Sequence, residues 1–447
     1  MINKLSTTQR KSYIYSMKKI LLIIFALQVY TINAQSWSTF EGGLGLDPVN
    51  ALIMYNGNLI IGGGAGGIQQ WDGSAWSSLG TGVNGIVDAL VIYNGNLIAG
   101  GQFTTAGGIP ANNIAMWNGS AWSVIGKGVS GSVSIISPGV NALCVYNDSL
   151  FAAGYFDSAG GKRARNIAEW NGSNWVALGH GVDSTVYALA VYDSTVFAGG
   201  QFDSAGTVRA NILAEWNGTS WSANSLGGSQ VEALTVYNNN LVACGMLLPG
   251  NIAKWNGSTW TAFGSGISGG MHNVESLTTY SGNLIAGGMF KNAGGISANG
   301  VAQWNGSSWD SLGGGLDGGP NVIGVESLIE YDGLLIAGGE ISVPGGPPCG
   351  IAQWGILTGF NELKVESEKV KVYPNPSNGI FSVELKGNSD KFKVEVYNIF
   401  GEKVISQFTI DHSPFTINLS SQPKGIYLYR VTSERGESIF SGKLVIQ

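Results

Sequence analysis

Short apolar segments alternate with turn residues along most of the chain. Residues 96–126 contain three of them, "NLIAGG", "NNIAMW" and "SAWSVIG", and a fourth, "VNALCVY", precedes the next turn. Asn-Gly separates apolar segments at two places per unit, inside "WNGS" and inside "YNGN". Because both central residues of a type I′ turn need positive φ, Asn-Gly is a strong hairpin signal. The pattern predicts a repeated unit of four antiparallel strands.

A pair of tryptophans is the most regular feature of this unit. The sequence Trp-Asn-Gly-Ser/Thr-x-Trp, with Asp for Asn in the first copy, occurs six times. The pairs are Trp71 and Trp76, Trp117 and Trp122, Trp170 and Trp175, Trp216 and Trp221, Trp255 and Trp260, and Trp304 and Trp309. Of the two tryptophans left over, Trp37 resembles the second member of a pair and Trp354 resembles the first.

An incomplete pair at each end of the repeats indicates a closed ring. An open solenoid has no reason to begin and end within a unit, and it needs atypical caps. A ring can build one blade from both ends and leave no free sheet edge. We therefore expect an all-β protein with a seven-bladed β-propeller at residues 35–355, closed by its first and last strands in one blade.

Glycines and tryptophans are expected to shape the blade packing. Paired glycines such as Gly100-Gly101 suit an inner strand crowded near the axis. We expect the tryptophans to pack between neighbouring blades, and an exposed ligand platform is the alternative. The order in "LIAGG…IAMWNGSAW" resembles the kelch repeat of galactose-oxidase-like propellers, over residues 37–354. Gly-Gly is lost in "FAAGYF" and "VACGML". The resemblance implies the architecture and no cofactor, since nothing supports carrying over the copper site of galactose oxidase.

The sequence changes character after Trp354. Residues 356–369 lose the repeat, gain charge and are predicted to be a linker. Residues 370–447 contain alternating runs, such as 393–397 and 426–431, that are typical of half-buried strands. About this length of such sequence predicts a small C-terminal β-sandwich.

The tail closely resembles the type A C-terminal sorting domain of the Bacteroidetes type IX secretion system, through "YPNPSNGIF", "VYNIFGEKV", "KGIYLYRV" and "GKLVIQ". The motif positions are Tyr373, Pro374, Asn375, Pro376, Gly379, Phe381, Gly401, Gly425, Tyr427 and Lys443. The resemblance implies handling by the inner-membrane export machinery and then by the outer-membrane type IX translocon. It also implies that the tail is usually removed, and that the cargo is released or attached to surface lipopolysaccharide.

The N-terminus has the pattern of an export signal. Lys18 and Lys19 precede the apolar residues 20–27, and Ala34 ends the segment. This predicts a signal peptide at residues 1–34, cleaved before Gln35, with Met17 as an alternative start. The apolar run is too short to span a bilayer, and no other segment resembles a transmembrane anchor. The protein is expected to be secreted or displayed at the cell surface by way of the periplasm.

Composition narrows the functional classes. Charged residues make up 12% of the chain, and the net charge is −6. Residues 35–360 carry seven basic and 19 acidic residues, a net charge of −12, so no nucleic-acid partner is expected. Cys144, Cys244 and Cys349 lie far apart without a CxxC or Cys/His cluster. We expect small buried strand residues, and one disulfide is the alternative in an oxidising compartment.

Candidate ligand-binding residues lie in loops at one end of the units. The turns inside "YNGN" and "WNGS" are minimal and share one face, whereas the loops of the opposite face are longer and vary. Variation on a constant frame marks the binding face. Lys162, Arg163 and Arg165 lie in one such loop, and Arg209 lies at an equivalent place one blade on. An acidic ligand group would suit them, and ordinary solvated charges are the alternative.

Catalytic and metal signals are weak. The three histidines, His180, His272 and His412, share no metal-ligand spacing, and no calcium loop or nucleophile elbow is present. Acid pairs for glycoside hydrolysis stay open, because acidic residues on loops are not specific. Three tripeptides resemble the O-glycosylation acceptor of Bacteroidetes periplasmic proteins, with an Asp/Ser turn as the alternative. They begin at Asp148, Asp157 and Asp203.

Together these patterns favour a secreted or surface-attached propeller, expected to be a monomer, that binds an extracellular glycan or protein. A polysaccharide-acting enzyme on a propeller scaffold and a structural surface-layer component are the alternatives.

Overall fold

The computed structural model describes residues 35–40, 48–64, 67–131, 137–224, 226–248, 250–270, 273–316, 324–356, 370–373, 377–385, 392–398, 403–410, 415–433 and 438–446. Every regular element in these ranges is a β-strand, which confirms the predicted all-β class. The chain divides into two compact units, of which one is Gln35–Gly355 and the other contains Ile356–Gln447. The predicted signal peptide and residues 357–369 of the predicted linker lie outside the described residues.

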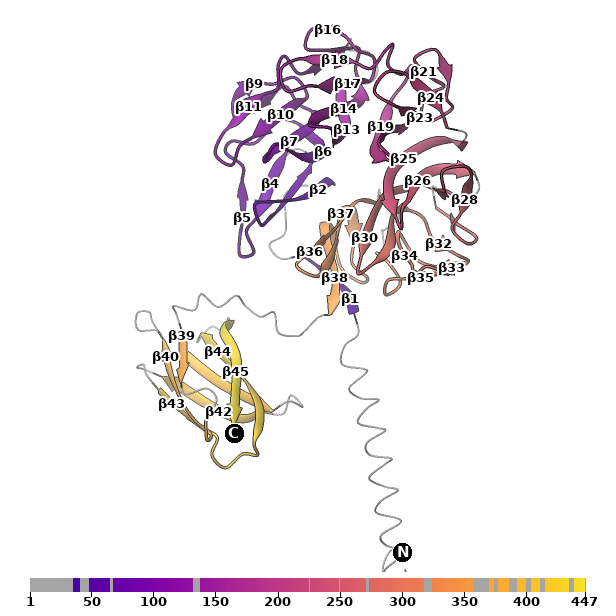
Figure 1. Cartoon of the computed structure of the whole chain (residues 1–447). Coiled ribbons are helices and arrows are strands. Elements are labelled where there is room, and N and C mark those ends of the chain that lie inside the picture. The colour runs from indigo at the N-terminus through magenta and orange to yellow at the C-terminus, as the bar shows by residue number, and fades with distance from the viewer. Residues whose placement is uncertain are drawn as a thin grey trace, which may run out of the picture. The chain divides into compact units, whose positions relative to one another are not determined.

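Seven antiparallel sheets of four strands form the main part of the described residues of Gln35–Gly355 (Figure 1). We number them along the chain. Sheet 1 is β2 (Val49–Tyr55), β3 (Asn58–Gly63), β4 (Ile68–Trp71) and β5 (Trp76–Ser78). Sheet 2 is β6 (Ile86–Tyr93), β7 (Asn96–Gln102), β10 (Ile114–Trp117) and β11 (Trp122–Val124). Sheet 3 is β13 (Gly139–Tyr146), β14 (Ser149–Tyr155), β17 (Ile167–Trp170) and β18 (Trp175–Ala177).

The remaining four sheets repeat this order. Sheet 4 is β19 (Val186–Tyr192), β20 (Thr195–Gly200), β23 (Leu213–Trp216) and β24 (Trp221–Ala223). Sheet 5 is β25 (Gly227–Tyr237), β26 (Asn240–Leu248), β27 (Ile252–Trp255) and β28 (Trp260–Ala262). Sheet 6 is β30 (Asn273–Tyr280), β31 (Asn283–Met289), β34 (Val301–Trp304) and β35 (Trp309–Ser311). Sheet 7 is β36 (Gly324–Tyr331), β37 (Leu334–Ser342), β38 (Pro348–Ile356) and β1 (Gln35–Thr39).

The sheets have the arrangement of a β-propeller. The first strand of each sheet contacts the first strand of the next, and β36 of sheet 7 contacts β2 of sheet 1. In sheet 7 the outer strand comes from the start of the chain, since β1 pairs with β38, as Figure 1 shows. The Gln353 side chain donates a hydrogen bond to Ser38 Oγ at 3.2 Å across this pair.

Each first strand carries a β-bulge at an equivalent position, just after a valine, and β25 has a second bulge before it. The register shifts between Val49 and Ala51 in β2, and between Val87 and Ala89 in β6. The same shift occurs in the other five first strands. A bulge leaves one residue unpaired and turns its side chain away from the ladder. The seven bulged residues are Asn50, Asp88, Asn141, Tyr187, Glu232, Glu275 and Glu326, which we call the bulge residues.

The paired glycines lie on the second strand of the sheet, at positions where a Cβ has no room. A Cβ added to Gly100 of β7 would lie 2.6 Å from Cγ1 of Val140 on the first strand of sheet 3. A Cβ on Gly101 would collide with the Ile86 carbonyl oxygen of its own sheet. The glycines are therefore required by the closeness of the next sheet and of the bulged partner strand.

The tryptophan pairs lie between neighbouring sheets. Within a pair the ring centroids are 5.4 Å apart for Trp117 and Trp122, and the first indole flanks the loop of the preceding sheet. The second indole donates its N–H to that sheet, for example from Trp122 to the Leu79 carbonyl at 2.7 Å. All fourteen tryptophans are buried or half-buried.

The two kinds of turn differ, contrary to expectation. The tyrosine turns are two-residue type I′ turns, with φ of 48° at Asn94 and 75° at Gly95 between the paired Tyr93 and Asn96. The "WNGS" segments are four-residue loops, because Trp117 pairs with Trp122 and only Gly119 has positive φ. Asn118 Oδ1 accepts hydrogen bonds from the Ser120 and Ala121 backbone N–H groups, which is an Asx-type turn. The type I′ prediction was wrong at "WNGS".

Four of the long loops contain regular hairpins that the sequence did not predict. They join the second and third strands of sheets 2, 3, 4 and 6. Their strands are β8 (Thr105–Ala106), β9 (Ile109–Pro110), β15 (Ser158–Ala159), β16 (Lys162–Arg163), β21 (Ser204–Ala205), β22 (Val208–Arg209), β32 (Asn292–Ala293) and β33 (Ile296–Ser297). Two further strands, β12 (Val129–Ser130) and β29 (Ile267–Ser268), pair with β15 and β32.

The C-terminal unit has two antiparallel sheets over one core. One sheet contains β39 (Val370–Tyr373), β40 (Ile380–Leu385) and β43 (Phe415–Asn418). The other contains β41 (Phe392–Asn398), β42 (Lys403–Ile410), β44 (Gly425–Ser433) and β45 (Ser438–Ile446). Phe381 and Ile417 of the first sheet share a buried cluster with Val394, Tyr427 and Leu444 of the second. The predicted strands at 393–397 and 426–431 are confirmed.

Candidate functional site

The two ends of the repeat unit have different characters. Strand direction alternates within a sheet, so the tyrosine turns and the "WNGS" loops lie at the same end. Contacts agree, since Tyr93 Oη donates to the Asp148 carbonyl in the next tyrosine turn at 3.0 Å. A Cβ on Gly172, in a "WNGS" loop, would lie 3.8 Å from the same Tyr93 Oη. We call the opposite end, which carries the four hairpins and the segments after the fourth strands, the loop face.

The four predicted basic residues all lie on the loop face. Lys162 and Arg163 form β16, Arg165 follows it, and all three side chains are exposed. Arg209 lies on β22, where it pairs with Ser204 as Arg163 pairs with Ser158. Arg209 is thus the register equivalent of Arg163 in the next sheet.

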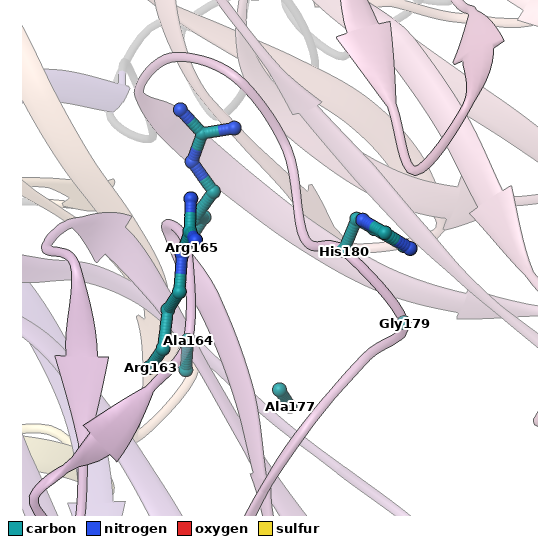
Figure 2. Close-up of a pocket in the computed structure, with 6 residues that line it drawn as sticks. All are labelled: Arg163, Ala164, Arg165, Ala177, Gly179 and His180. Atoms are coloured by element: carbon teal, nitrogen blue, oxygen red, sulfur yellow. The ribbon is translucent and has the colours of Figure 1, made fainter.

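A cavity of about 300 Å³ lies beside this hairpin in sheet 3. Figure 2 shows Arg163 and Arg165 extending along one side and His180 on the other. Small residues complete the lining, namely Ala164, Ala177 and Gly179. The structure therefore brings two of the predicted residues together and adds His180, which the sequence placed merely in a loop. Lys162 and Arg209 do not line the cavity.

A second polar group is formed by the bulge residues. Asn50 of sheet 1 donates a hydrogen bond to Asp88 Oδ1 of sheet 2 at 2.8 Å, and Asn141 donates to the Val186 carbonyl of sheet 4 at 3.2 Å. Glu232 accepts a hydrogen bond from Gln230. The bulge lies near the start of each first strand, and that start is the end at the loop face. Seven polar residues thus lie at this end of the first strands, and two of them, Asn50 and Asn141, bond to the next first strand.

Burial changes the acidity of several bulge residues. Burial raises the pKa of Asp88, although the hydrogen bond from Asn50 opposes the shift. Burial likewise raises the pKa of Glu232 against the hydrogen bond from Gln230. The pKa of Tyr187 is raised by burial and by the negative charge of Glu232. Carboxyl groups whose pKa is raised in this way are suited to accept or donate protons.

The sequence analysis missed this group although the signal is present. Each first strand contains Val-x-Ala-Leu or Val-x-Ser-Leu, as in "VNAL", "VDAL", "VYAL" and "VESL". In five of the seven units the valine packs on a glycine of the preceding sheet, whereas x is Asn, Asp, Tyr or Glu. A polar residue within a constant apolar motif would have indicated that the same position of each first strand contributes to one polar group at the loop face.

The histidines and cysteines have the following places in the described part of the chain. Within the described ranges no three His, Cys, Asp or Glu side chains are placed to hold a metal ion, and His272 and His412 lie outside those ranges. Cys144 and Cys244 are buried, Cys349 is half-buried, and none of the three forms a disulfide. Burial raises the pKa of Cys144 to about 12, so its reactive thiolate is scarce at neutral pH.

The three serine tripeptides have defined places. Ser158 Oγ lies 2.8 Å from Ser130 Oγ, and Ser204 Oγ donates to Asp183 Oδ2 at 2.6 Å. Ser149 Oγ, in a tyrosine turn, donates to Glu169 Oε1 at 2.7 Å. Each hydroxyl therefore has a hydrogen-bond partner within the fold.

In the C-terminal unit, buried motif residues define a small core. Phe381 is fully buried, and Tyr427 donates its hydroxyl to the Pro423 carbonyl at 2.8 Å. Gly379 has φ of 102°, and a Cβ there would lie 2.7 Å from Ser420 Cα. Residues 371–447 match the family model of the secretion system C-terminal sorting domain. The tail is a sorting domain. Such a domain indicates export by the type IX secretion system to the cell surface or beyond.

Other motif residues of the sorting domain have mixed surroundings. Tyr373 on β39 is exposed, Gly425 begins β44, and Lys443 on β45 pairs with Leu428. Pro374, Asn375, Pro376 and Gly401 lie outside the described residues. Within the described part of the chain no helix is long and apolar enough to cross a membrane.

Beyond the sorting domain, the comparisons are distant. No curated protein sequence matches the chain significantly. The WD40 β-propeller domain of Doa1 is similar with a TM-score of 0.44 and 12% identity, over 72% of this chain and 96% of that one. A fungal alcohol oxidase of the AA5 family, in complex with copper, is similar with a TM-score of 0.42 and 12% identity, over 93% of this chain and 100% of that one. A β-fructofuranosidase of Bombyx mori is similar with a TM-score of 0.24 and 10% identity, over 96% of this chain and 94% of that one. At these scores the likenesses carry no conclusion about chemistry.

Proposed function

We propose that this chain is a released or surface-attached propeller protein whose loop face binds an extracellular glycan or protein. In this proposal residues 1–34, or the part that follows Met17, direct the chain across the inner membrane. The sorting domain at 370–447 then addresses the outer-membrane translocon, and residues 356–369 link it to the propeller at 35–355. The match of residues 371–447 to the sorting-domain family supports the route.

The proposed binding frame is a closed ring of seven kelch-like blades, with β1 and β38 sharing the last blade. Support comes from the seven four-stranded sheets in the described residues and from the contact between β36 and β2. Closure matters for function, because it holds the seven loop-face ends at fixed distances from one another. Side chains presented from different sheets can then act on one ligand without a large ordering cost.

One observation carries the binding role: the units differ from one another mainly at the loop face. The opposite end repeats the same two-residue turn in all seven sheets, with paired positive φ values from Asn56-Gly57 to Asp332-Gly333. The loop face instead carries hairpins in four of the sheets, bulge residues of four kinds (Asn, Asp, Tyr and Glu) and the cavity beside Arg163. A constant frame with one variable end is typical of binding proteins.

Binding to glycan and peptide arrays tests the proposal with the purified chain. We expect a defined ligand whose binding is weakened by loop-face substitutions such as Asp88→Asn and Arg163→Gln. Asp332→Asn, in a tyrosine turn of the opposite end, is the matched control and should leave binding unchanged. Loss of binding in Asp332→Asn alone would contradict the assignment of the loop face, and absence of any ligand would favour a structural surface-layer component.

The raised pKa values of Asp88 and Glu232 favour a polysaccharide-acting enzyme as the second candidate. A carboxylic acid with a raised pKa is the general acid that glycoside hydrolysis needs. Release of reducing ends from a panel of polysaccharides tests this candidate. Hydrolysis by the wild-type chain that disappears in Glu232→Gln would establish it, and absence of hydrolysis across the panel would reject it.

A further inference from the structure

The cavity in sheet 3 lies where two other sheets have a side-chain bridge. In sheet 2, Asn112 donates its side-chain N–H to the Lys127 carbonyl at 2.8 Å, which ties the hairpin to the segment after the fourth strand. In sheet 6, Asn299 makes the same bond to the Gly314 carbonyl at 2.8 Å. Counted from the tryptophan pairs, these positions correspond to Arg165 and His180 in sheet 3.

Arg165 does not make that bond, and the space between hairpin and segment opens. The cavity of about 300 Å³ lies there, with Arg165 on one side and His180 on the other (Figure 2). The backbone of Arg165 still ties the hairpin to the segment after the fourth strand, since Val182 N–H donates to the Arg165 carbonyl at 3.1 Å. The hollow is therefore a fixed feature of sheet 3, framed by the same backbone as its counterparts.

Positive charge is concentrated at this hollow. The repeat region has seven basic residues against 19 acidic ones, yet Lys162, Arg163 and Arg165 lie within four consecutive positions. Lys127 of sheet 2 approaches the same hairpin, because a Cβ on Gly161 would lie 3.6 Å from its Cδ. A surface with a net negative charge thus contains one cationic cavity.

The polar side chains that line the cavity have no partner within the described part of the chain. Arg163, Arg165 and His180 make no side-chain hydrogen bond or ion pair there. The nearby carboxylate of Asp183 is occupied by Ser204 and by the Asp203 backbone N–H, at 2.6 to 3.1 Å. Two guanidinium groups extended in the same direction can hold a planar or tetrahedral oxyanion through paired N–H donors.

We propose that this cavity binds a carboxylate- or sulfate-bearing sugar unit of an extracellular polysaccharide. This inference rests on the proposed loop-face binding role and names its ligand chemistry. The volume is at the lower end of ligand pockets, roughly 300–1,000 Å³, which suits one charged sugar unit. An acidic protein partner is disfavoured, because Ala164, Ala177 and Gly179 supply no aromatic or large apolar anchor of the kind that protein interfaces use.

Titration calorimetry on the purified full chain tests the assignment with defined probes. Oligogalacturonate carries carboxylates, sulfated carrageenan oligomers carry sulfates, dextran oligomers are neutral, and polyglutamate is an acidic peptide. We expect one of the two anionic sugars to bind, and the arm that binds identifies the group. Affinity should fall about tenfold in Arg163→Gln and again in Arg165→Gln, and it should weaken as salt is raised.

Arg209→Gln is the matched control, because Arg209 holds the register position of Arg163 in sheet 4 outside the cavity. It should change affinity less than twofold, and unchanged melting temperatures should accompany all three exposed substitutions. Equal loss of affinity in Arg209→Gln, or binding of polyglutamate in place of the sugars, would overturn the cavity assignment. Binding of dextran that is insensitive to all three variants would also overturn it while leaving the loop-face function intact. Absence of binding to any probe, together with an empty array, would reject both.

Discussion

The indole rings of Trp37 and Trp354 lie 5.6 Å apart between centroids, with an interplanar angle of 48°. Pairs formed within one hairpin have the same geometry, for instance 5.4 Å and 48° for Trp71 and Trp76. Trp37 also donates its indole N–H to the Leu312 carbonyl of sheet 6 at 2.9 Å. The residue near the start of the repeats therefore occupies the place of a second tryptophan in sheet 7.

Replacing Trp37 by alanine should destabilise the propeller as much as replacing an internal tryptophan. Trp37 is 7% exposed, and loss of a buried tryptophan costs roughly 3–5 kcal/mol. Trp122→Ala is the matched control, because Trp122 is also 7% exposed and bonds to the Leu79 carbonyl. Urea denaturation of both variants measures the effect. A midpoint for Trp37→Ala close to the wild-type value would mean that β1 contributes little to sheet 7.

Substitution of the turn asparagine by glycine should change the stability of the protein to different extents in the two turn types. Asn94 has φ of 48°, which glycine adopts at no steric cost, so Asn94→Gly should change stability by only a few tenths of a kcal/mol. Asn118→Gly removes an acceptor of two backbone hydrogen bonds at 2.9 Å and should cost about 1 kcal/mol. Thermal unfolding of the two variants compares them directly. Equal losses would show that the "WNGS" side chain does not stabilise its loop.

Asp88→Asn should stabilise the protein at neutral pH. Burial raises the folded-state pKa of Asp88 above its ordinary value of 3.8, so the folded state favours the protonated group. That contribution is present below pH 3.8 and is lost as pH rises through the folded-state pKa. Asparagine keeps the acceptor for Asn50 without the charge, and we expect a gain of about 1–2 kcal/mol at pH 7. The gain should shrink toward pH 4 in thermal unfolding.

Asp183→Asn should change the stability at pH 7 in the opposite direction to Asp88→Asn in the same experiment. Burial acts to raise the pKa of Asp183, but hydrogen bonds from the Ser204 side chain and from backbone N–H groups outweigh it and lower the pKa overall. Its stabilising contribution is present above the unfolded pKa and is lost as pH falls through the folded-state pKa. Asp183→Asn should therefore be less stable than wild type at pH 7, and the difference should narrow in acid. A parallel pH dependence of the two variants would refute the assigned causes.

Local patterns predicted the elements well. The two-residue turns followed from residues such as Asn94-Gly95, because positive φ is a property of the turn residues themselves. The strands of the sorting domain followed from alternation at positions such as Val394 and Val396. The "WNGS" loops were misjudged because Asn118 uses its side chain as an acceptor, and its register depends on the pairing of Trp117 with Trp122.

The sequence by itself determined the repeat unit, the strand order within it and the export signal at the C-terminus, since each depends on residues close together in the chain. Only the tertiary structure decided which side chains meet. Asn50 reaches Asp88 because successive sheets place their loop-face ends side by side. Arg165 faces His180 because the hairpin of sheet 3 and the segment after its fourth strand meet at the loop face. Contacts of this kind depend on bulge positions and on a missing asparagine bridge, which change no local hydrophobic pattern.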